Sequence, residues 1–215
     1  MADNPSALGT WQAVHPTQCA AWFSTLTVPW WVAGGWALDL YAGGQNRPHS
    51  DLDVGILRRD VREVLAMLSS WEVFEARAGA LTRLNAGETP RMEVNSLWCR
   101  PMGAVQWVLE LMLDESAEDS WVFRRRPDIR RPLKTVTRRN SDGLPYLAPE
   151  IQLLYKAKES RDRDQADFDH IAPYLDPGAR AWLRQALTRL DPGHAWIGKL
   201  QSSGHCGLPT LDFRP

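Results

Sequence analysis

The sequence predicts an α/β N-terminal half followed by a helical C-terminal half. Before Pro149, short apolar runs alternate with amphipathic segments, which is typical of strands and helices in turn. After Pro149 the periodicity is helical, in segments at 150–158, 164–174 and 177–190. The 215 residues suit one large domain or two small ones, and 44% hydrophobic residues are enough to build a core.

Two adjacent glycines follow the first predicted strand. Residues 30–33 form a short apolar run, and Gly34 and Gly35 come directly before a predicted helix at 36–41. Backbone N–H groups at the start of a helix bind phosphate, so these glycines are candidates for a phosphate-binding turn. Taken alone, a pair of glycines is more often an ordinary turn.

An Asp-x-Asp pair follows this turn. Residues 50–57 alternate between polar and apolar side chains, which predicts a half-buried strand. Asp51 and Asp53 are two residues apart and therefore point to the same face, while Leu52 and Val54 point into the core. Two carboxylates at this spacing can share one Mg²⁺ ion or bridge two. The glycine turn and the acid pair in this order predict a metal-dependent phosphate site.

A third carboxylate is expected on a neighbouring strand. Residues 105–113 predict a strand rich in apolar residues, and Glu110 interrupts it. A buried carboxylate without a partner is costly, and a metal ion at the sheet surface would compensate it. The alternative is an ion pair between Glu110 and an arginine of residues 124–126. Asp114 has the same parity and is the fallback, although we expect it past the end of the strand.

Composition narrows the class of protein. There are 25 Lys and Arg against 26 Asp and Glu, which argues against a duplex-DNA binder and favours a small-molecule acceptor. Cys19, Cys99 and Cys206 are far apart, so we expect free thiols in a reducing compartment. No apolar run reaches membrane-spanning length, and the N-terminus lacks the features of a signal peptide. We therefore expect a cytoplasmic protein without membrane contact.

The order of these motifs resembles the nucleotidyltransferases of the DNA polymerase β superfamily. Within it, the likeness is strongest to antibiotic nucleotidyltransferases of the aminoglycoside 2''-adenylyltransferase type, at motif level over residues 28–115. The segment 145–158, with Arg161 and residues 164–167, is similar to their helical C-terminal part. The resemblance implies an α+β fold: a mixed β-sheet flanked by helices, then a C-terminal helical bundle. It implies domains at 1–145 and 146–215, with the active site between them.

The resemblance also assigns roles by position. It implies that Asp51, Asp53 and the acid at or near Glu110 are catalytic and bind Mg²⁺, although the third family acid is commonly Asp. The implied nucleotide-binding residues are Gly34, Gly35, Arg47, His49, Ser50 and Lys156. Arg47 and His49 either touch phosphate or brace the loop of the Asp pair. For His49 an ordinary surface position is a further open alternative, and for Lys156 so is an exposed helix face.

The implied reaction is in-line attack of a substrate hydroxyl on the α-phosphorus of a nucleoside triphosphate, with pyrophosphate leaving. ATP is the favoured nucleotide, two Mg²⁺ ions are expected, and the acceptor is an aminoglycoside or related antibiotic. The acidic residues between Asp114 and Asp119 are either a lip that attracts a polycationic acceptor or a solvated loop.

Two other functions stay open at this stage. A nucleotidyltransferase toxin of an abortive-infection or toxin–antitoxin system would act on tRNA or protein, and the arginine-rich tract at 124–139 would then grip an RNA backbone. The same tract could instead face the triphosphate or be a solvated linker. A non-enzymatic binding module would keep the fold and lack turnover.

Overall fold

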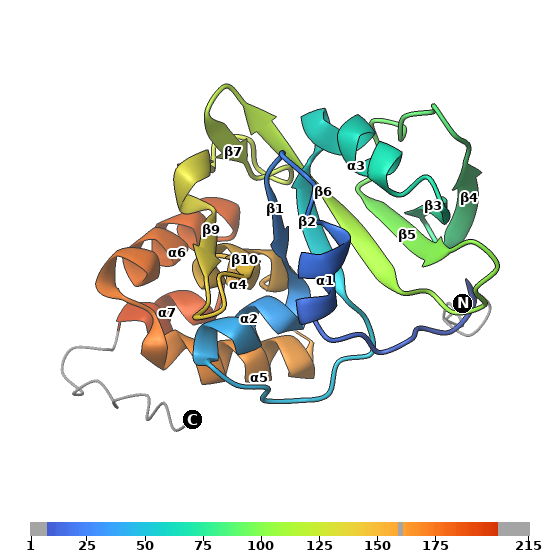
Figure 1. Ribbon diagram of the computed structural model, residues 1–215. Coiled ribbons are helices and arrows are strands. Elements are labelled where there is room, and N and C mark those ends of the chain that lie inside the picture. The colour runs from blue at the N-terminus through green and yellow to red at the C-terminus, as the bar shows by residue number, and fades with distance from the viewer. Residues whose placement is uncertain (1–7, 159–160, 202–215) are drawn as a thin grey trace.

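The computed structural model describes residues 8–158 and 161–201 and is built around one mixed ten-stranded sheet (Figure 1). The strand order is β4-β3-β5-β6-β2-β1-β10-β9, and β7 pairs with both β6 and β8. The strands are β1 (Trp30–Val32), β2 (Asp53–Leu57), β3 (Trp71–Arg77), β4 (Ala80–Leu84), β5 (Ser96–Pro101), β6 (Leu109–Ala117), β7 (Ser120–Val122), β8 (Arg130–Pro132), β9 (Thr137–Arg139) and β10 (Pro145–Leu147).

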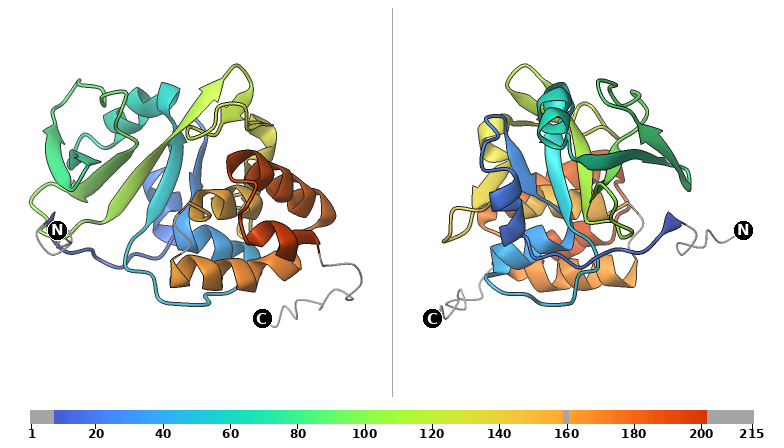
Figure 2. Two further views of the ribbon diagram at one scale, coloured as in Figure 1. Left: turned by 180° about the vertical axis from the view of Figure 1, so that it is seen from behind. Right: turned by 45° about the vertical axis from the view of Figure 1, so that its right-hand side comes forward.

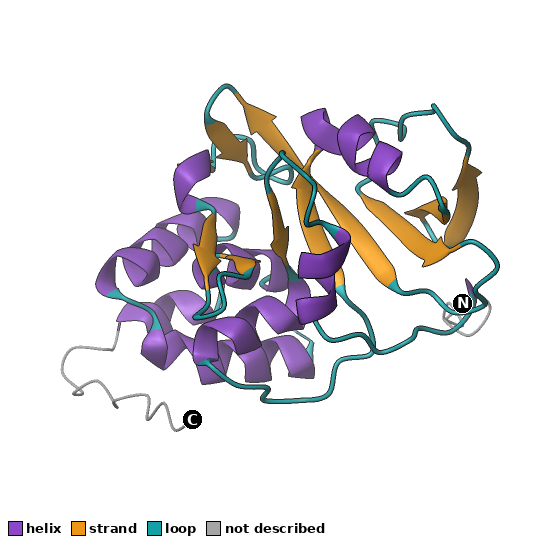
Figure 3. Ribbon diagram, in the orientation of Figure 1, coloured by secondary structure: helices purple, strands orange, loops and turns teal. Residues whose placement is uncertain are grey.

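Helices cover this sheet unevenly. The α-helices are α1 (Thr17–Trp22), α2 (Gly34–Ala42), α3 (Val61–Met67), α4 (Pro149–Lys156), α5 (Asp162–Ile171), α6 (Pro177–Leu190) and α7 (Trp196–Gln201), with 3₁₀ turns at Arg58–Asp60, Leu133–Thr135 and Ala172–Tyr174. Figure 3 shows α2 and α4–α7 gathered towards the β9–β10 end, and the view from behind shows the same grouping (Figure 2). The expected α+β fold, a mixed sheet with helices following it, is confirmed. The division into domains at residue 145 stays a prediction.

The two central strands carry the buried side chains that the alternation predicted. In β2, Val54 and Ile56 are fully buried, and in β6 so are Leu109 and Leu111. These strands run parallel, and β1 pairs antiparallel with β2. The apolar faces of β2 and β6 therefore bury together, which fixes their register and with it the positions of the polar side chains that alternate between them.

Two strand boundaries differ from the sequence prediction. Asp51 lies before β2, because β1 ends at Val32 and turns into α2, which leaves no strand backbone for Asp51 to pair with. The strand predicted at 105–113 begins only at Leu109 and continues to Ala117. The apolar run at its start misled the prediction: Val105 is 80% exposed, and residues near 107 bond to the N-terminal segment instead.

Two of the three cysteines lie in the core as free thiols. Cys19 and Cys99 are both buried, and burial raises the pKa of Cys19 to about 12, which makes it unreactive. Cys206 lies outside the described residues. Among the described residues, no helix is both long and apolar enough to cross a bilayer.

Gly55 is the point where the core tolerates no side chain. It pairs with Trp31 across β1 and β2, and a Cβ atom at Gly55 would lie 2.0 Å from the indole nitrogen of Trp31. Because Trp31 is 1% exposed, its ring has no room to move away. We expect Gly55→Ala to lower the free energy of unfolding by about 1–3 kcal/mol in urea denaturation. Gly44→Ala is the control, since nothing lies within 4 Å of its position, and a similar loss there would contradict this account.

Candidate active site

The glycine turn and Asp53 of the acid pair meet directly at the start of α2. Gly34 has φ +65°, a conformation that favours glycine, and a Cβ atom there would lie 2.0 Å from Asp53 Oδ2. The backbone N–H of Ala33 donates to the Asp53 carbonyl at 2.8 Å. Any side chain at Gly34 would therefore push the carboxylate of Asp53 away from the helix start.

Glu110 lies beside Asp53 on the neighbouring strand. The two residues are paired in register between β2 and β6, so their side chains project from the same face. Burial raises the pKa of Asp53 well above its usual value, and the charges of Glu110 and Asp51 raise it further. Burial likewise raises the pKa of Glu110, although a hydrogen bond from Ser96 Oγ at 2.7 Å works against it. Three acids therefore crowd one corner of the sheet, at a cost that a cation would relieve.

The three acids influence one another through their charges, but they do not form a complete set of metal ligands. Asp51 is half-buried in the segment before β2, and its charge acts on both Asp53 and Glu110. Within the described residues, no three His, Cys, Asp or Glu side chains are already grouped closely enough to hold a metal ion. The assignment of Asp51, Asp53 and Glu110 as metal ligands stays a prediction.

Arg47 and His49 pack against the second glycine of the turn. A Cβ atom at Gly35 would lie 2.4 Å from the ring of His49 and 2.5 Å from the guanidinium of Arg47. His49 is 8% exposed and its Nε2 lies 2.6 Å from Asp39 Oδ2, so the surface position considered for it is wrong. Ser50, by contrast, is exposed between this cluster and Asp51.

Lys156 reaches the same region from the last turn of α4. Its side chain is 9% exposed and pairs with Asp167 at 2.8 Å and Asp164 at 3.1 Å. The alternative of an exposed helix face is therefore wrong for this lysine. Its positive charge lowers the pKa of Asp53, which means that Lys156 faces the acid cluster electrostatically.

A cavity of about 110 Å³ opens beside Asp53 and Gly34. Its lining includes Arg124 and Arg125 from the arginine-rich tract and Gln152 and Tyr155 of α4, and Arg125 donates to the Tyr155 carbonyl at 3.0 Å. Arg124 and Arg125 therefore share a cavity with Asp53, while residues 125–128 are exposed to solvent. Further along, Arg131 and Arg138 pair with Glu150 of α4.

Asp114 lies inside β6, four residues beyond Glu110, and not past the strand end as expected. It is 5% exposed, accepts a short hydrogen bond from the hydroxyl of Tyr155, and lines the far side of the cavity. Its register partner is Leu57, at the opposite end of β2 from Asp53. Glu115 pairs with Arg58, so these two acids do not form an exposed lip; only Glu118 and Asp119 are exposed.

Several residues at this site carried no signal in the sequence. Gln152 accepts a hydrogen bond from the Gly34 N–H at 2.8 Å, across 118 residues of chain. Asp39 orients His49, and Ser96 donates to Glu110. Asp39 lies within the helix predicted at 36–41, but nothing in the sequence pairs its carboxylate with His49.

A glycine turn that seats one carboxylate, with a second carboxylate in register beside it, is the arrangement of a nucleotidyltransferase. A model of the aminoglycoside-2''-adenylyltransferase family matches residues 17–171, which is well over half of the chain. The chain therefore belongs to this family, and it is an antibiotic nucleotidyltransferase by family, an enzyme class associated with antibiotic resistance.

Several solved structures are similar to the chain. The lincosamide antibiotic adenylyltransferase LnuA, lincomycin-bound, is 18% identical with a TM-score of 0.49, over 76% of this chain and 99% of that one. ANT(2'')-Ia in complex with adenylyl-2''-tobramycin is 16% identical with a TM-score of 0.45, over 86% and 93%. An antigenic nucleotidyltransferase-like protein from Paracoccidioides brasiliensis is 20% identical with a TM-score of 0.47, over 86% and 88%. No curated protein matches the chain.

The buried Asp114 gives a prediction about stability and pH. Burial raises the pKa of Asp114 from 3.8 to about 6, against the hydrogen bond from Tyr155. Between these values the folded protein holds a proton that the unfolded chain has lost, so Asp114 lowers stability as pH rises from about 4 to 6. We expect Asp114→Asn to gain stability relative to wild type over this range, by up to about 3 kcal/mol.

The measurement is urea denaturation of both proteins at pH 4, 5, 6 and 7. Because other carboxyl groups titrate in both proteins, their contributions cancel in the difference. A difference in unfolding free energy that stays constant from pH 4 to pH 7 would contradict the buried, protonated state of Asp114.

Proposed function

We propose that this enzyme transfers the nucleoside monophosphate of a nucleoside triphosphate, with ATP as the favoured donor, to a hydroxyl of an aminoglycoside or related antibiotic. The reaction depends on Mg²⁺ and takes place in the cytoplasm. The family supplies the reaction class, while the nucleotide, the metal and the acceptor are our inference. The observation that carries the proposal is the contact of Gly34 with Asp53, next to Glu110 in register.

The charge of the acid cluster favours a divalent cation. Asp53 and Glu110 are both costly to ionise, and each is made more so by the charge of Asp51. Hard oxygen donors of this kind suit Mg²⁺, and the residues fit such an ion. Asp51, Asp53 and Glu110 would hold it, and it would polarise the phosphate and acidify the attacking hydroxyl.

The remaining residues fit the triphosphate and the moving proton. The Gly34 N–H donates to Gln152, but the next N–H groups of α2, those of Gly35 and Trp36, have no side-chain partner among the described residues and would serve a phosphate oxygen. Lys156 acts on Asp53 through its charge and Arg124 lines the cavity beside Asp53, so both would supply positive charge to the triphosphate. As the substrate oxygen bonds to the α-phosphorus and the bond to pyrophosphate breaks, we expect Glu110 to accept the hydroxyl proton.

The test is pyrophosphate release with Mg²⁺, each of the four nucleoside triphosphates, and a panel of aminoglycosides and lincosamides. We expect release that depends on the acceptor and that falls by about 10⁴-fold or more in Asp51→Asn/Asp53→Asn, because both proposed ligands lose their charge. Asp119→Asn, at an exposed turn, is the control for the loss of an acid elsewhere and should retain wild-type release.

Absence of release with every antibiotic would contradict the small-molecule acceptor. Incorporation of labelled nucleotide into tRNA by the same protein would then favour the RNA-directed toxin. Full activity of the doubly substituted protein would remove Asp51 and Asp53 from the mechanism.

A further inference from the structure

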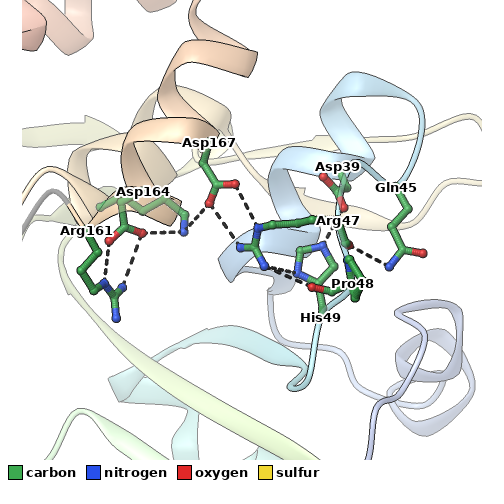
Figure 4. A network of polar contacts seen from close by, with 9 residues as sticks. Asp39, Gln45, Arg47, Pro48, His49, Arg161, Asp164 and Asp167 are labelled. Atoms are coloured by element: carbon green, nitrogen blue, oxygen red, sulfur yellow. Dashed lines mark hydrogen bonds and ion pairs between the residues drawn. The ribbon is translucent and has the colours of Figure 1, made fainter.

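A network of ion pairs ties the loop before Asp51 to the helices that follow the sheet (Figure 4). At its centre, Asp167 of α5 binds Arg47 and Lys156 at the same time. We name these three residues the Arg47–Asp167–Lys156 bridge. The bridge connects segments that are 109 or more residues apart in sequence, since it joins residue 47 to residue 156.

Asp167 holds each partner with a separate set of contacts. Arg47 Nε lies 3.2 Å from Asp167 Oδ1 and Arg47 Nη2 lies 3.3 Å from Oδ2, so the guanidinium binds the carboxylate in a bidentate contact. Lys156 Nζ lies 2.8 Å from Oδ2. Burial alone would raise the pKa of Asp167, but the hydrogen bonds from Arg47 and Lys156 keep it below the usual value. Asp167 is therefore ionised at neutral pH and 7% exposed.

One end of the bridge fixes the loop that leads to Asp51. Arg47 Nη1 donates to His49 Nδ1 at 3.2 Å and to the Pro48 carbonyl at 3.3 Å. Because arginine can only donate, His49 Nδ1 must accept, which leaves the ring proton on Nε2 for Asp39. Both nitrogens of His49 thus have partners, which ties the loop to α2 and to Arg47 two residues before Asp51.

The other end of the bridge faces Asp53. Lys156 is the last residue of α4, and its charge lowers the pKa of Asp53. The neighbouring acid Asp164 also binds Lys156, at 3.1 Å, together with Arg161. No contact joins Asp164 to Arg47 among the described residues, so only Asp167 links this lysine to the loop.

A buried ion network of this kind is weak evidence for stability, because the cost of removing charges from water offsets their attraction. Its better-attested effect is to fix one arrangement of the groups that it joins. We propose that Asp167 is a positioning residue for nucleotidyl transfer: it sets the loop carrying Asp51 at a fixed place relative to Lys156 of α4. This inference rests on the proposed function of the same site.

The test compares hydrogen exchange of the backbone amides in 45–52 with steady-state kinetics. In Asp167→Asn the loop should exchange about tenfold faster or more, since its tie to α5 is lost. The kcat for pyrophosphate release should fall by about 10–100-fold, as for other residues that orient metal ligands, with the KM for the nucleotide changed less than about threefold. Asp167→Glu, which keeps the charge, should recover part of the loss.

The matched control is Asp164→Asn, on the same helix and also buried. It removes a partner of Lys156 but leaves Arg47 bound, so exchange in 45–52 should stay at the wild-type rate. Arg47→Gln, whose side chain is 30% exposed, is a second variant that breaks the same link and does not depend on Asp167→Asn folding. The Arg47→Gln/Asp167→Asn double variant should be no worse than the poorer single one.

Equal loop exchange in Asp167→Asn and Asp164→Asn would overturn the proposal, as would an unchanged kcat in Asp167→Asn. Faster loop exchange as expected, in a protein whose wild type shows no transfer to any acceptor, would instead overturn the proposed function and leave the bridge as a brace of the loop.

Discussion

The architecture of the site depends on one close contact, between Gly34 at the start of α2 and the carboxylate of Asp53. Only a residue without a side chain allows an acid to sit at the first turn of this helix, because any Cβ atom would overlap the carboxylate oxygen. From this contact the rest follows by register. β2 pairs with β6, which brings Glu110 alongside Asp53, and β1 pairs with β10, which leads into α4.

The contact concentrates negative charge where the sheet gives little solvation, and the surrounding chain offsets it with cations from distant segments. Lys156 of α4 and Arg163 of α5 lower the pKa of Asp53 through their charges, and Arg124, after β7, lines the cavity beside it. The buried carboxylates of Asp164 and Asp167 on α5 bind the Lys156 ammonium group and fix its position relative to the acids. The helical segment thus supplies charge to the site and restrains it.

Sequence reasoning found the parts of the site that local pattern encodes. The glycine turn, the alternation through Asp53 and the acid Glu110 within an apolar run each left a local signature, and helix periodicity gave α6 at Pro177–Leu190 to the residue. Sequence reasoning failed where the interacting residues are distant in the chain. The strand β6 was displaced because its start and its pairing with β7 depend on tertiary contacts, and the link from Asp167 to Arg47 spans 120 residues.

The central claim is that Asp51, Asp53 and Glu110 are held close together to bind a divalent cation. The direct measurement is the thermal unfolding temperature of wild type and Asp53→Asn as MgCl₂ is added. Binding to the folded state alone raises Tm, so the account predicts a rise for wild type and for the Asp119→Asn control and none for Asp53→Asn. Without metal, Asp53→Asn should be at least as stable as wild type, because a repelled buried charge is gone. An equal rise in Tm for wild type and Asp53→Asn would contradict the account.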